Sequence, residues 1–245
     1  MPQTANKTLN QIRDLPRSRA PLDVLAWAES RYRGNIALAT SLGPGSLAII
    51  DMLAELGRDI PVFLLDTGFL FQATHELKAR VEARYGIEIE AIRPALSVEE
   101  QAERHGPRLW ERSADHCCAM RKVEPLSRAL HGLDAWITGL RRDQGPGRAG
   151  IETVEWDHSH GLMKINPLAW WSRDELFDLL RTRGVPYNPL LDDGYRSIGC
   201  QPCTRRAADA DDPTDERAGR WSGTTKTECG IHLVRSTPST DLPQE

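Results

Sequence analysis

Five cysteines fall into three tight groups, and this grouping is the feature of the sequence most able to do chemistry. Cys117 and Cys118 are adjacent at the start of a helical pattern, Cys200 and Cys203 form a Cys-x-x-Cys in a loop, and Cys229 stands apart. Four thiolates are the usual complement of a tetrahedral zinc site or of a [4Fe–4S] cluster. The first four cysteines therefore predict a metal site, and the fifth is left over.

Each group also has a simpler interpretation. A lone Cys-x-x-Cys can be a redox pair or half of a zinc knuckle, and adjacent cysteines can be small buried hydrophobic residues. Both groups in one chain without an export signal favour metal ligation, because structural disulfides are rare in the cytosol. The spacing leaves zinc and iron open. It favours iron, since a cubane spreads its ligands over four irons and tolerates adjacent cysteines.

Cys229 lies in Thr227-Glu-Cys-Gly-Ile-His232, downstream of a charged stretch. We expect it to be exposed on a mobile tail, where a cysteine is a poor structural element and a poor fifth ligand. Gly230 permits other groups to approach the chain closely next to Cys229, and His232 could help to hold a thiolate. Together these neighbours indicate that Cys229 is a nucleophile. The alternative interpretation is an incidental free thiol.

The composition indicates a soluble cytoplasmic protein. The 245-residue chain has a net charge of −4, which argues against a general nucleic-acid surface. No apolar run approaches the roughly 20 residues that span a bilayer, and residues 1–20 lack the apolar core of a signal peptide. An anionic substrate would need a local cluster of Lys and Arg, so the placement of basic residues matters more than their number.

Strand and helix patterns alternate along the chain. The predicted strands are 35–40, 61–66, 87–92 and 135–138, and the predicted helices are 47–56, 72–85 and 172–183. Such units in series predict an α/β fold with a parallel twisted sheet, helices on both faces and ligands at the carboxyl ends of the strands. The loops at those ends are 41–46, 66–69 and 139–150. Residues 209–223 and 236–245 are expected to be mobile.

Four motifs make the sequence recognisable: Leu65-Asp-Thr-Gly68, Cys117-Cys-Ala-Met-Arg-Lys-Val-Glu-Pro125, Trp136-Ile-Thr-Gly-Leu-Arg-Arg-Asp-Gln144 and Gly199-Cys-Gln-Pro-Cys-Thr204. The tail adds Arg217-Ala-Gly-Arg-Trp221 and Glu228-Cys-Gly-Ile-His232. With these motifs the chain resembles the assimilatory adenylylsulfate reductases of the phosphoadenylylsulfate/adenylylsulfate reductase family, within the PP-loop superfamily. The resemblance runs from about Gly34 to His232.

The resemblance implies a division of the chain and a role for each motif residue. A PP-loop (adenine nucleotide alpha hydrolase-like) domain at 21–208 would follow a polar extension at 1–20. It would precede a mobile lid at 209–235 and a disordered end at 236–245. Cys117, Cys118, Cys200 and Cys203 would ligate a [4Fe–4S] cluster, and Cys229 would be the nucleophile. The substrate-binding residues would be Ser41, Gly43, Ser46, Asp66, Thr67, Gly68, Lys122, Arg141, Arg142, Arg217, Arg220 and His232.

The implied reaction is the thioredoxin-dependent reduction of adenylylsulfate to sulfite and AMP, in sulfate assimilation and cysteine biosynthesis. Cys229 would attack sulfur and become an S-sulfocysteine, from which reduced thioredoxin or a glutaredoxin-like donor would release sulfite. Cluster cysteines usually accompany use of adenylylsulfate in the family, and the 3′-phosphorylated substrate or dual use is the alternative. We expect no nucleic-acid or membrane partner, and the sequence leaves a homo-oligomer open.

Two segments depart from the family pattern. The loop Ser41-Leu-Gly-Pro-Gly-Ser46 contains a Pro and an extra Gly, and Trp221-Ser-Gly223 replaces a run of tryptophans. Two other functions compete with the reductase. A PP-loop enzyme that thiolates a nucleic acid would need a Ser-Gly-Gly-x-Asp-Ser type of loop, which 41–46 is not. A zinc-binding module would leave Cys229 and the arginine pairs without a purpose, and each arginine by itself would be interpreted as a solvated charge or surface ion pair.

Overall fold

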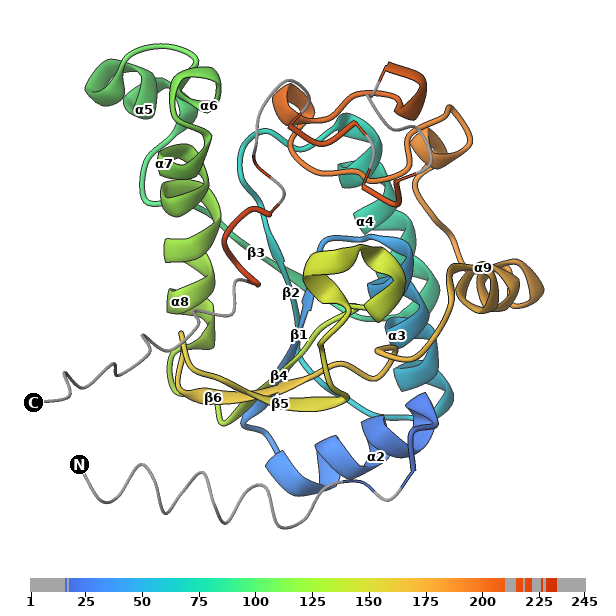
Figure 1. The fold of residues 1–245 in the computed structure, drawn as a ribbon. Coiled ribbons are helices and arrows are strands. Elements are labelled where there is room, and N and C mark those ends of the chain that lie inside the picture. Colours follow the sequence, from blue (N-terminus) through green and yellow to red (C-terminus); the bar gives the residue numbers. More distant parts are fainter. Residues whose placement is uncertain are drawn as a thin grey trace, which may run out of the picture.

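A sheet of six strands runs through the part of the chain that the structure describes (Figure 1). The computed structural model describes residues 16, 18–209, 215–217, 219–221, 226 and 228–232. The expectations for 1–15 and 236–245, and the expected mobility of 210–214, 218, 222–225, 227 and 233–235, lie outside these residues. In spatial order the strands are β3 (Ile89–Ile92), β2 (Val62–Leu65), β1 (Ile36–Thr40), β4 (Ala135–Ile137), β6 (Leu162–Ile165) and β5 (Val154–Asp157). Neighbouring strands are parallel except β5, which is antiparallel to β6 at one edge.

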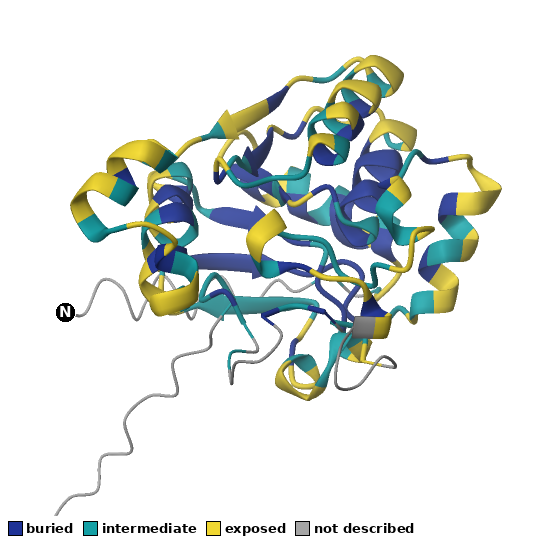
Figure 2. Ribbon diagram, turned by 90° about the horizontal axis from the view of Figure 1, so that it is seen from above, coloured by how far each residue is buried: buried dark blue, intermediate teal, exposed yellow. Residues whose placement is uncertain are grey.

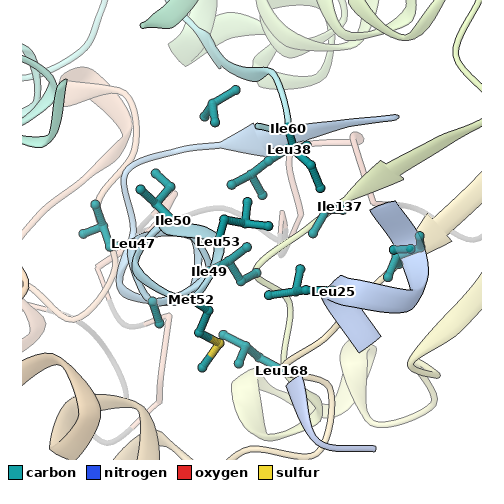
Figure 3. Close-up of a cluster of buried hydrophobic side chains, with 14 of the residues drawn as sticks. Leu25, Leu38, Leu47, Ile49, Ile50, Met52, Leu53, Ile60, Ile137 and Leu168 are labelled. Atoms are coloured by element: carbon teal, nitrogen blue, oxygen red, sulfur yellow. The ribbon is translucent and has the colours of Figure 1, made fainter. Parts of the chain in front are cut away.

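Successive side chains of the strands enter two apolar layers, one on each face of the sheet. Ile36 and Leu38 of β1 belong to the larger core, which α2 (Pro21–Tyr32), α3 (Pro44–Glu55), α4 (Gln72–Tyr85) and α9 (Arg173–Thr182) cover (Figure 3). Ala37, between them, packs on the opposite face with Trp136 and with α8 (Glu124–Leu130). Figure 2 shows the central strands in the colour of buried residues, whereas the edge strands β3 and β5 are partly exposed or of intermediate burial. This period of two is what a sheet covered on both faces requires.

The second face carries the helices that lead to the cysteines. α5 (Val98–His105), α6 (Leu109–Arg112) and α7 (Ala114–Cys118) precede α8, and a π-helical turn at Ala119–Val123 joins α7 to α8 (Figure 1). Short 3₁₀ turns occupy Arg142–Gln144, Pro146–Arg148, Pro189–Leu191, Gln201–Cys203 and Ala207–Asp209. Of the helices that the structure describes, none combines the length and apolarity needed to cross a bilayer.

The predicted α/β class with a mostly parallel sheet is confirmed, and all four predicted strands are present. Helix 72–85 was predicted with its observed bounds, and Ser172 caps α9 in a capping box with Glu175. Helix α3 begins three residues before its predicted start because Pro44 occupies its first position, where proline is favourable. The hairpin of β5 and β6 was not predicted, because a lysine such as Lys164 is not typical of a buried strand. In the structure Lys164 is buried and pairs with Glu155.

Two loops at the carboxyl ends of β1 and β4 touch through their backbones. An alanine Cβ at Gly45 would lie 2.4 Å from the carbonyl oxygen of Gly139, and one at Gly139 would lie 2.6 Å from the backbone nitrogen of Ser46. Such distances are too short for carbon against backbone atoms, so only glycine fits at either position. The start of α3 is therefore fixed against the loop that follows β4.

We predict that Gly45→Ala lowers the free energy of unfolding by about 1–3 kcal/mol in urea denaturation, because the new methyl group overpacks this contact. Helix propensity alone predicts the opposite sign, since Gly45 lies within α3. Gly150→Ala is the matched control, because an alanine Cβ there meets no atom within 4 Å. Equal stabilities of the two variants would show that the loops do not constrain each other.

Candidate active site

A cleft lies at the carboxyl ends of the central strands, where loops after β1, β2 and β4 meet the C-terminal segment. Parallel sheets bind ligands at this edge, at the point where the strand order reverses between β1 and β4. The cleft is lined by ten of the residues that the sequence predicted to act on substrate: Ser41, Gly43, Ser46, Thr67, Lys122, Arg141, Arg217, Arg220, Cys229 and His232.

The loop after β1 presents the start of a helix to the cleft. Leu42 has a φ of 53°, and its N–H donates to Thr40 Oγ1 over 2.8 Å. The same hydroxyl donates to Ser46 Oγ over 2.8 Å, and Ser46 Oγ donates to the carbonyl of Gly43. No side chain caps α3 at Gly43. Uncapped N–H groups at a helix start attract anions, so this loop suits a phosphate or sulfate group.

Basic side chains give the cleft a positive wall. Lys122, Arg148, Arg217 and Arg220 line it. The Nε atoms of Arg217 and Arg220 are buried without a hydrogen-bond partner among the described residues. Burial, and after it the charge of the neighbouring Arg148, lowers the pKa of Arg217 to about 10. Guanidinium groups with spare donors fit an anion that carries several oxygens.

Arg220 reaches the cleft across Gly199, the residue before the Cys-x-x-Cys. An alanine Cβ at Gly199 would lie 2.3 Å from Arg220 Nη2. Arg220 Nη1 also donates to Ser197 Oγ over 3.3 Å. The glycine of this motif therefore makes room for an arginine that arrives from the tail.

Cys229 is buried, with 8% of its surface exposed, so the expectation of an exposed cysteine is wrong for this structure. Its segment folds back onto the protein, where Cys229 packs with Cys118 and Trp221 and the next apolar residue, Ile231, reaches the second apolar layer. Burial raises the pKa of the Cys229 thiol. Lys122, the backbone N–H of Ile231 and Arg220 more than offset this, and the pKa lies below its ordinary value.

His232, three residues after Cys229, stacks on the ring of Trp136. The ring centroids are 5.7 Å apart with an interplanar angle of 15°. Burial and the charges of Lys164 and Arg148 hold the pKa of His232 well below its usual range, so the ring is neutral near pH 7. Its Nδ1 is buried with no hydrogen-bond partner in the described part of the chain. The histidine thus anchors the end of the segment and offers a free ring nitrogen.

The other four cysteines line a second cavity beside the cleft, together with Phe69, Trp110, Ala114, Arg121, Lys122, Pro202 and Trp221. Lys122 lines both cavities. Thr67 Oγ1 lies 3.3 Å from Cys200 Sγ, and the amide Nε2 of Gln101 lies 4.0 Å from Cys117 Sγ. Hydroxyl and amide donors around sulfur are typical of the surroundings of thiolate-ligated metals.

The donor chemistry of this cavity fits a zinc ion or an iron–sulfur cluster, since four sulfur atoms face one space. Burial raises the pKa of Cys118 and of Cys203 to about 11, so metal binding would displace their protons. Within the described residues, no group of three or more Cys, His, Asp or Glu is arranged to hold a metal ion. The fit therefore rests on the donor set and the shared cavity.

Arg121, which sequence analysis did not single out, holds the cysteine-bearing turn in place. Arg121 is 2% exposed, and its guanidinium donates to Gln101 Oε1 and to the carbonyls of Thr67 and Ser97, all within 2.8 Å. It also lies over the ring of Phe69. Arg121 therefore ties the segment after Cys118 to the loop after β2, which brings the two walls of the cysteine cavity together.

Three predicted substrate residues lie outside the residues that line the cleft. Asp66 accepts a hydrogen bond from the N–H of Gly68 and pairs with Arg93, so it shapes the turn that presents Thr67. Arg142 pairs with Glu152 and lies over the ring of Trp170. Asp66, Gly68 and Arg142 were assigned to the substrate from the motifs. They lie outside the cleft lining because alternate residues of an extended segment point in different directions, so only some residues of a motif face the cleft.

Sequence analysis also missed residues that the structure brings to the cleft or beside it: Arg148, Arg173, Asn188, Glu216 and Glu228. Arg148 lies in the predicted loop 139–150, so a basic residue after a strand end was an available signal. The two glutamates gave no signal of this kind, because a carboxylate near an anion site is unfavourable unless cations neutralise it.

Comparisons with known proteins place this arrangement in context. The family model described as phosphoadenosine phosphosulfate reductase domain matches residues 35–206. An adenosine 5′-phosphosulfate reductase of Halalkalibacterium halodurans is 42% identical over 233 residues, which cover 95% of this chain and 100% of the relative. A phosphoadenosine 5′-phosphosulfate reductase of Gloeobacter violaceus is 46% identical over 216 residues, with 87% and 88% covered.

A solved structure supports the same assignment. The phosphoadenylyl-sulfate reductase of Candida auris, crystallised as a phosphate complex, is 34% identical to this chain. It superposes with a TM-score of 0.69 over 76% of this chain and 90% of the Candida protein. Sequence and fold thus agree on one group of relatives.

Proposed function

The chain belongs to the phosphoadenosine phosphosulfate reductase family, and we propose that it reduces adenylylsulfate to sulfite and AMP in sulfate assimilation and cysteine biosynthesis. Reduced thioredoxin, or a glutaredoxin-like thiol donor, would supply the two electrons. One observation carries the proposal. The tail cysteine lines the same cleft as Lys122, Arg217 and Arg220, so a thiol nucleophile and an anion-binding wall face one space.

In the first step the Cys229 thiolate attacks the sulfur of the sulfate group. The new S–S bond forms as the bond between sulfur and the bridging phosphate oxygen breaks, and AMP leaves with that electron pair. The cationic side chains shield the approaching anion from the sulfate oxygens and stabilise the charge that passes to the phosphate. The loop after β1, with Ser46 and the uncapped start of α3, would hold the nucleotide phosphate.

In the second step a thiolate of the donor attacks Cys229 Sγ and releases sulfite with the electron pair of the S–S bond. The second thiol of the donor then attacks the mixed disulfide, so that Cys229 leaves as a thiolate and the donor becomes a disulfide. Two protons are released overall. Because Cys229 is 8% exposed, the segment that carries it must open before a protein donor can reach it.

We further propose that Cys117, Cys118, Cys200 and Cys203 hold a [4Fe–4S] cluster. The support is the shared cavity, its all-sulfur donor set and the sulfur contacts of Thr67 and Gln101. When bound, the cluster would supply charge and rigidity next to Lys122 rather than electrons. Zinc is the competing occupant, because four thiolates suit it equally.

The choice between adenylylsulfate and its 3′-phosphorylated form is a proposal as well. Relatives of similar identity carry both names. We favour adenylylsulfate because four cysteines share the cavity beside Lys122 and cluster-type cysteines accompany that substrate in the family. Dual use is the alternative, and sulfite release from each nucleotide, measured side by side, decides between them. A thiolation enzyme is disfavoured because the loop 41–46 lacks the Ser-Gly-Gly-x-Asp-Ser pattern. A zinc module without activity is disfavoured because it does not explain a cysteine in the anion cleft.

We predict that Cys229→Ser lowers sulfite release from adenylylsulfate by on the order of 10³-fold or more, because the nucleophile is lost. The assay uses reduced thioredoxin and compares the variant with the wild type. Affinity for adenylylsulfate should stay within about threefold, since serine preserves the shape of the cleft. A Cys229→Ser protein that turns over normally would refute the mechanism.

We predict that Cys203→Ser loses iron and activity together, whereas Cys229→Ser retains its full iron content. Iron and zinc analysis together with a visible-region spectrum reads both outcomes. Colourless wild-type protein with stoichiometric zinc would exclude the cluster. Full iron in the Cys203 variant would remove that residue from the ligand set.

A further inference from the structure

Two carboxylates of the C-terminal segment lie between pairs of arginines. Glu216 contacts Arg141 and Arg173, and Glu228 contacts Arg148 and Arg217. We propose that Glu216 and Glu228 are positioning residues that dock the segment carrying Cys229 over the cleft. The inference deepens the proposed function and rests on it for its catalytic consequence, while the docking itself is independent of the reaction.

Glu228 immediately precedes Cys229 and is held by three hydrogen bonds. Arg148 binds it in a bidentate manner, with Nε 2.8 Å from Oε1 and Nη2 3.1 Å from Oε2. Arg217 Nη1 lies 2.9 Å from Oε1. Burial raises the pKa of the Glu228 carboxyl, but Arg148 and Arg217 bring it below its ordinary value, so the group stays ionised. A charged fork of this kind fixes the orientation of the residue that follows it.

Arg148 belongs to the body of the protein, in the turn Pro146–Arg148 after β4, whereas Arg217 belongs to the tail itself. Glu228 therefore joins the body, the turn at 215–217 and the cysteine in one contact. The side chains of Arg148, Glu228 and Arg217 are 11%, 16% and 16% exposed. Ion pairs at this depth are costly to break singly, since a lone buried charge is left behind.

Glu216 makes a second contact of the same kind. Arg173 Nη1, at the start of α9, lies 2.9 and 2.8 Å from its two carboxylate oxygens, and Arg141 Nη2 lies 3.0 Å from Oε1. Arg141 Nε donates to Asp143 Oδ1 over 2.9 Å. Carboxylates thus accept from both Nε and Nη2 of the Arg141 guanidinium. Arg141 lines the cleft, but its charge serves to dock the tail rather than to face the substrate.

The contacts of Glu216 and Glu228 suit the two states that the reaction requires of Cys229, which are enclosure with the substrate and exposure to the thiol donor. The closed segment excludes water and holds the thiol against Cys118 and Trp221, and opening presents Cys229 to the donor. Lys122 and Arg220 do not contribute to either carboxylate contact, so the charges nearest the thiol remain available to the substrate.

The docking can be measured without substrate by the rate at which iodoacetamide alkylates Cys229, read at the Cys229 peptide by mass spectrometry. The full-length holoprotein is used throughout. Glu228→Gln keeps the size of the side chain and removes its charge, and we expect alkylation about tenfold faster or more. Glu216→Gln should act in the same direction. Rates for both variants within about twofold of the wild type would overturn the proposal.

Two further variants keep the test decisive. Asp178→Asn removes a carboxylate from an exposed pair with Arg181 on α9, both 68% exposed, and should leave the rate unchanged. Arg148→Lys keeps the charge and loses the bidentate fork, so it should accelerate alkylation less than Glu228→Gln. If Glu228→Gln does not fold, the alkylation rate of Arg148→Lys is compared with that of the wild type instead. Acceleration by the exposed control equal to that by Glu228→Gln would count against specific docking.

The catalytic consequence separates positioning from general instability. In Glu228→Gln, formation of the S-sulfocysteine at saturating adenylylsulfate should slow about tenfold, whereas thioredoxin should attack the preformed adduct at an unchanged or higher rate. Equal slowing of both half-reactions would indicate a merely structural role. If the chain forms no adduct at all, the proposed function fails while the alkylation result still stands.

Discussion

Positive charge beside a buried thiol is the constraint on which the rest of this structure depends. A thiolate is poorly stabilised inside a protein, because burial raises the pKa of a thiol. Lys122, a backbone N–H and Arg220 outweigh burial and hold the pKa of the Cys229 thiol below its ordinary value. Lys122 lines both the cleft and the cysteine cavity, as does Cys200, so the two cavities share these residues. The same charges that stabilise the thiolate fit the sulfate group that it is proposed to attack.

The fold supplies this charge by bringing together residues far apart in the sequence. The parallel sheet aligns the loops after β1, β2 and β4 at one edge, and close contact between Gly45 and Gly139 fixes two of them. Arg121 ties the cysteine-bearing turn to the loop after β2. We propose that Glu216 and Glu228 dock the C-terminal segment over the cleft. The body of the protein thus places Lys122, and a segment that contacts the body through ion pairs and apolar packing places Cys229 together with Arg217 and Arg220.

Much of this could be predicted from the sequence because periodicity and motifs report local structure. Helix α4 and the central strands follow from apolar spacing. Nine of the twelve substrate-binding residues that the motifs implied line the cleft, as does the predicted nucleophile Cys229, whereas Asp66, Gly68 and Arg142 do not. Burial of Cys229 was not predictable, since it depends on long-range contacts of the tail with Cys118 and Trp221. Nor were the arginine partners of Glu216 and Glu228, because an ion pair across 43 or 80 residues leaves no local pattern.

In the proposed reaction, Cys229 itself takes up the sulfur of the substrate. Intact-mass and peptide mass spectrometry of the protein mixed with adenylylsulfate, without any reductant, tests it most directly. We expect a mass gain of one SO₃ group confined to the Cys229 peptide, and loss of that mass on addition of reduced thioredoxin. Sulfite production by a protein that never carries this adduct, or an adduct on another cysteine, would contradict it.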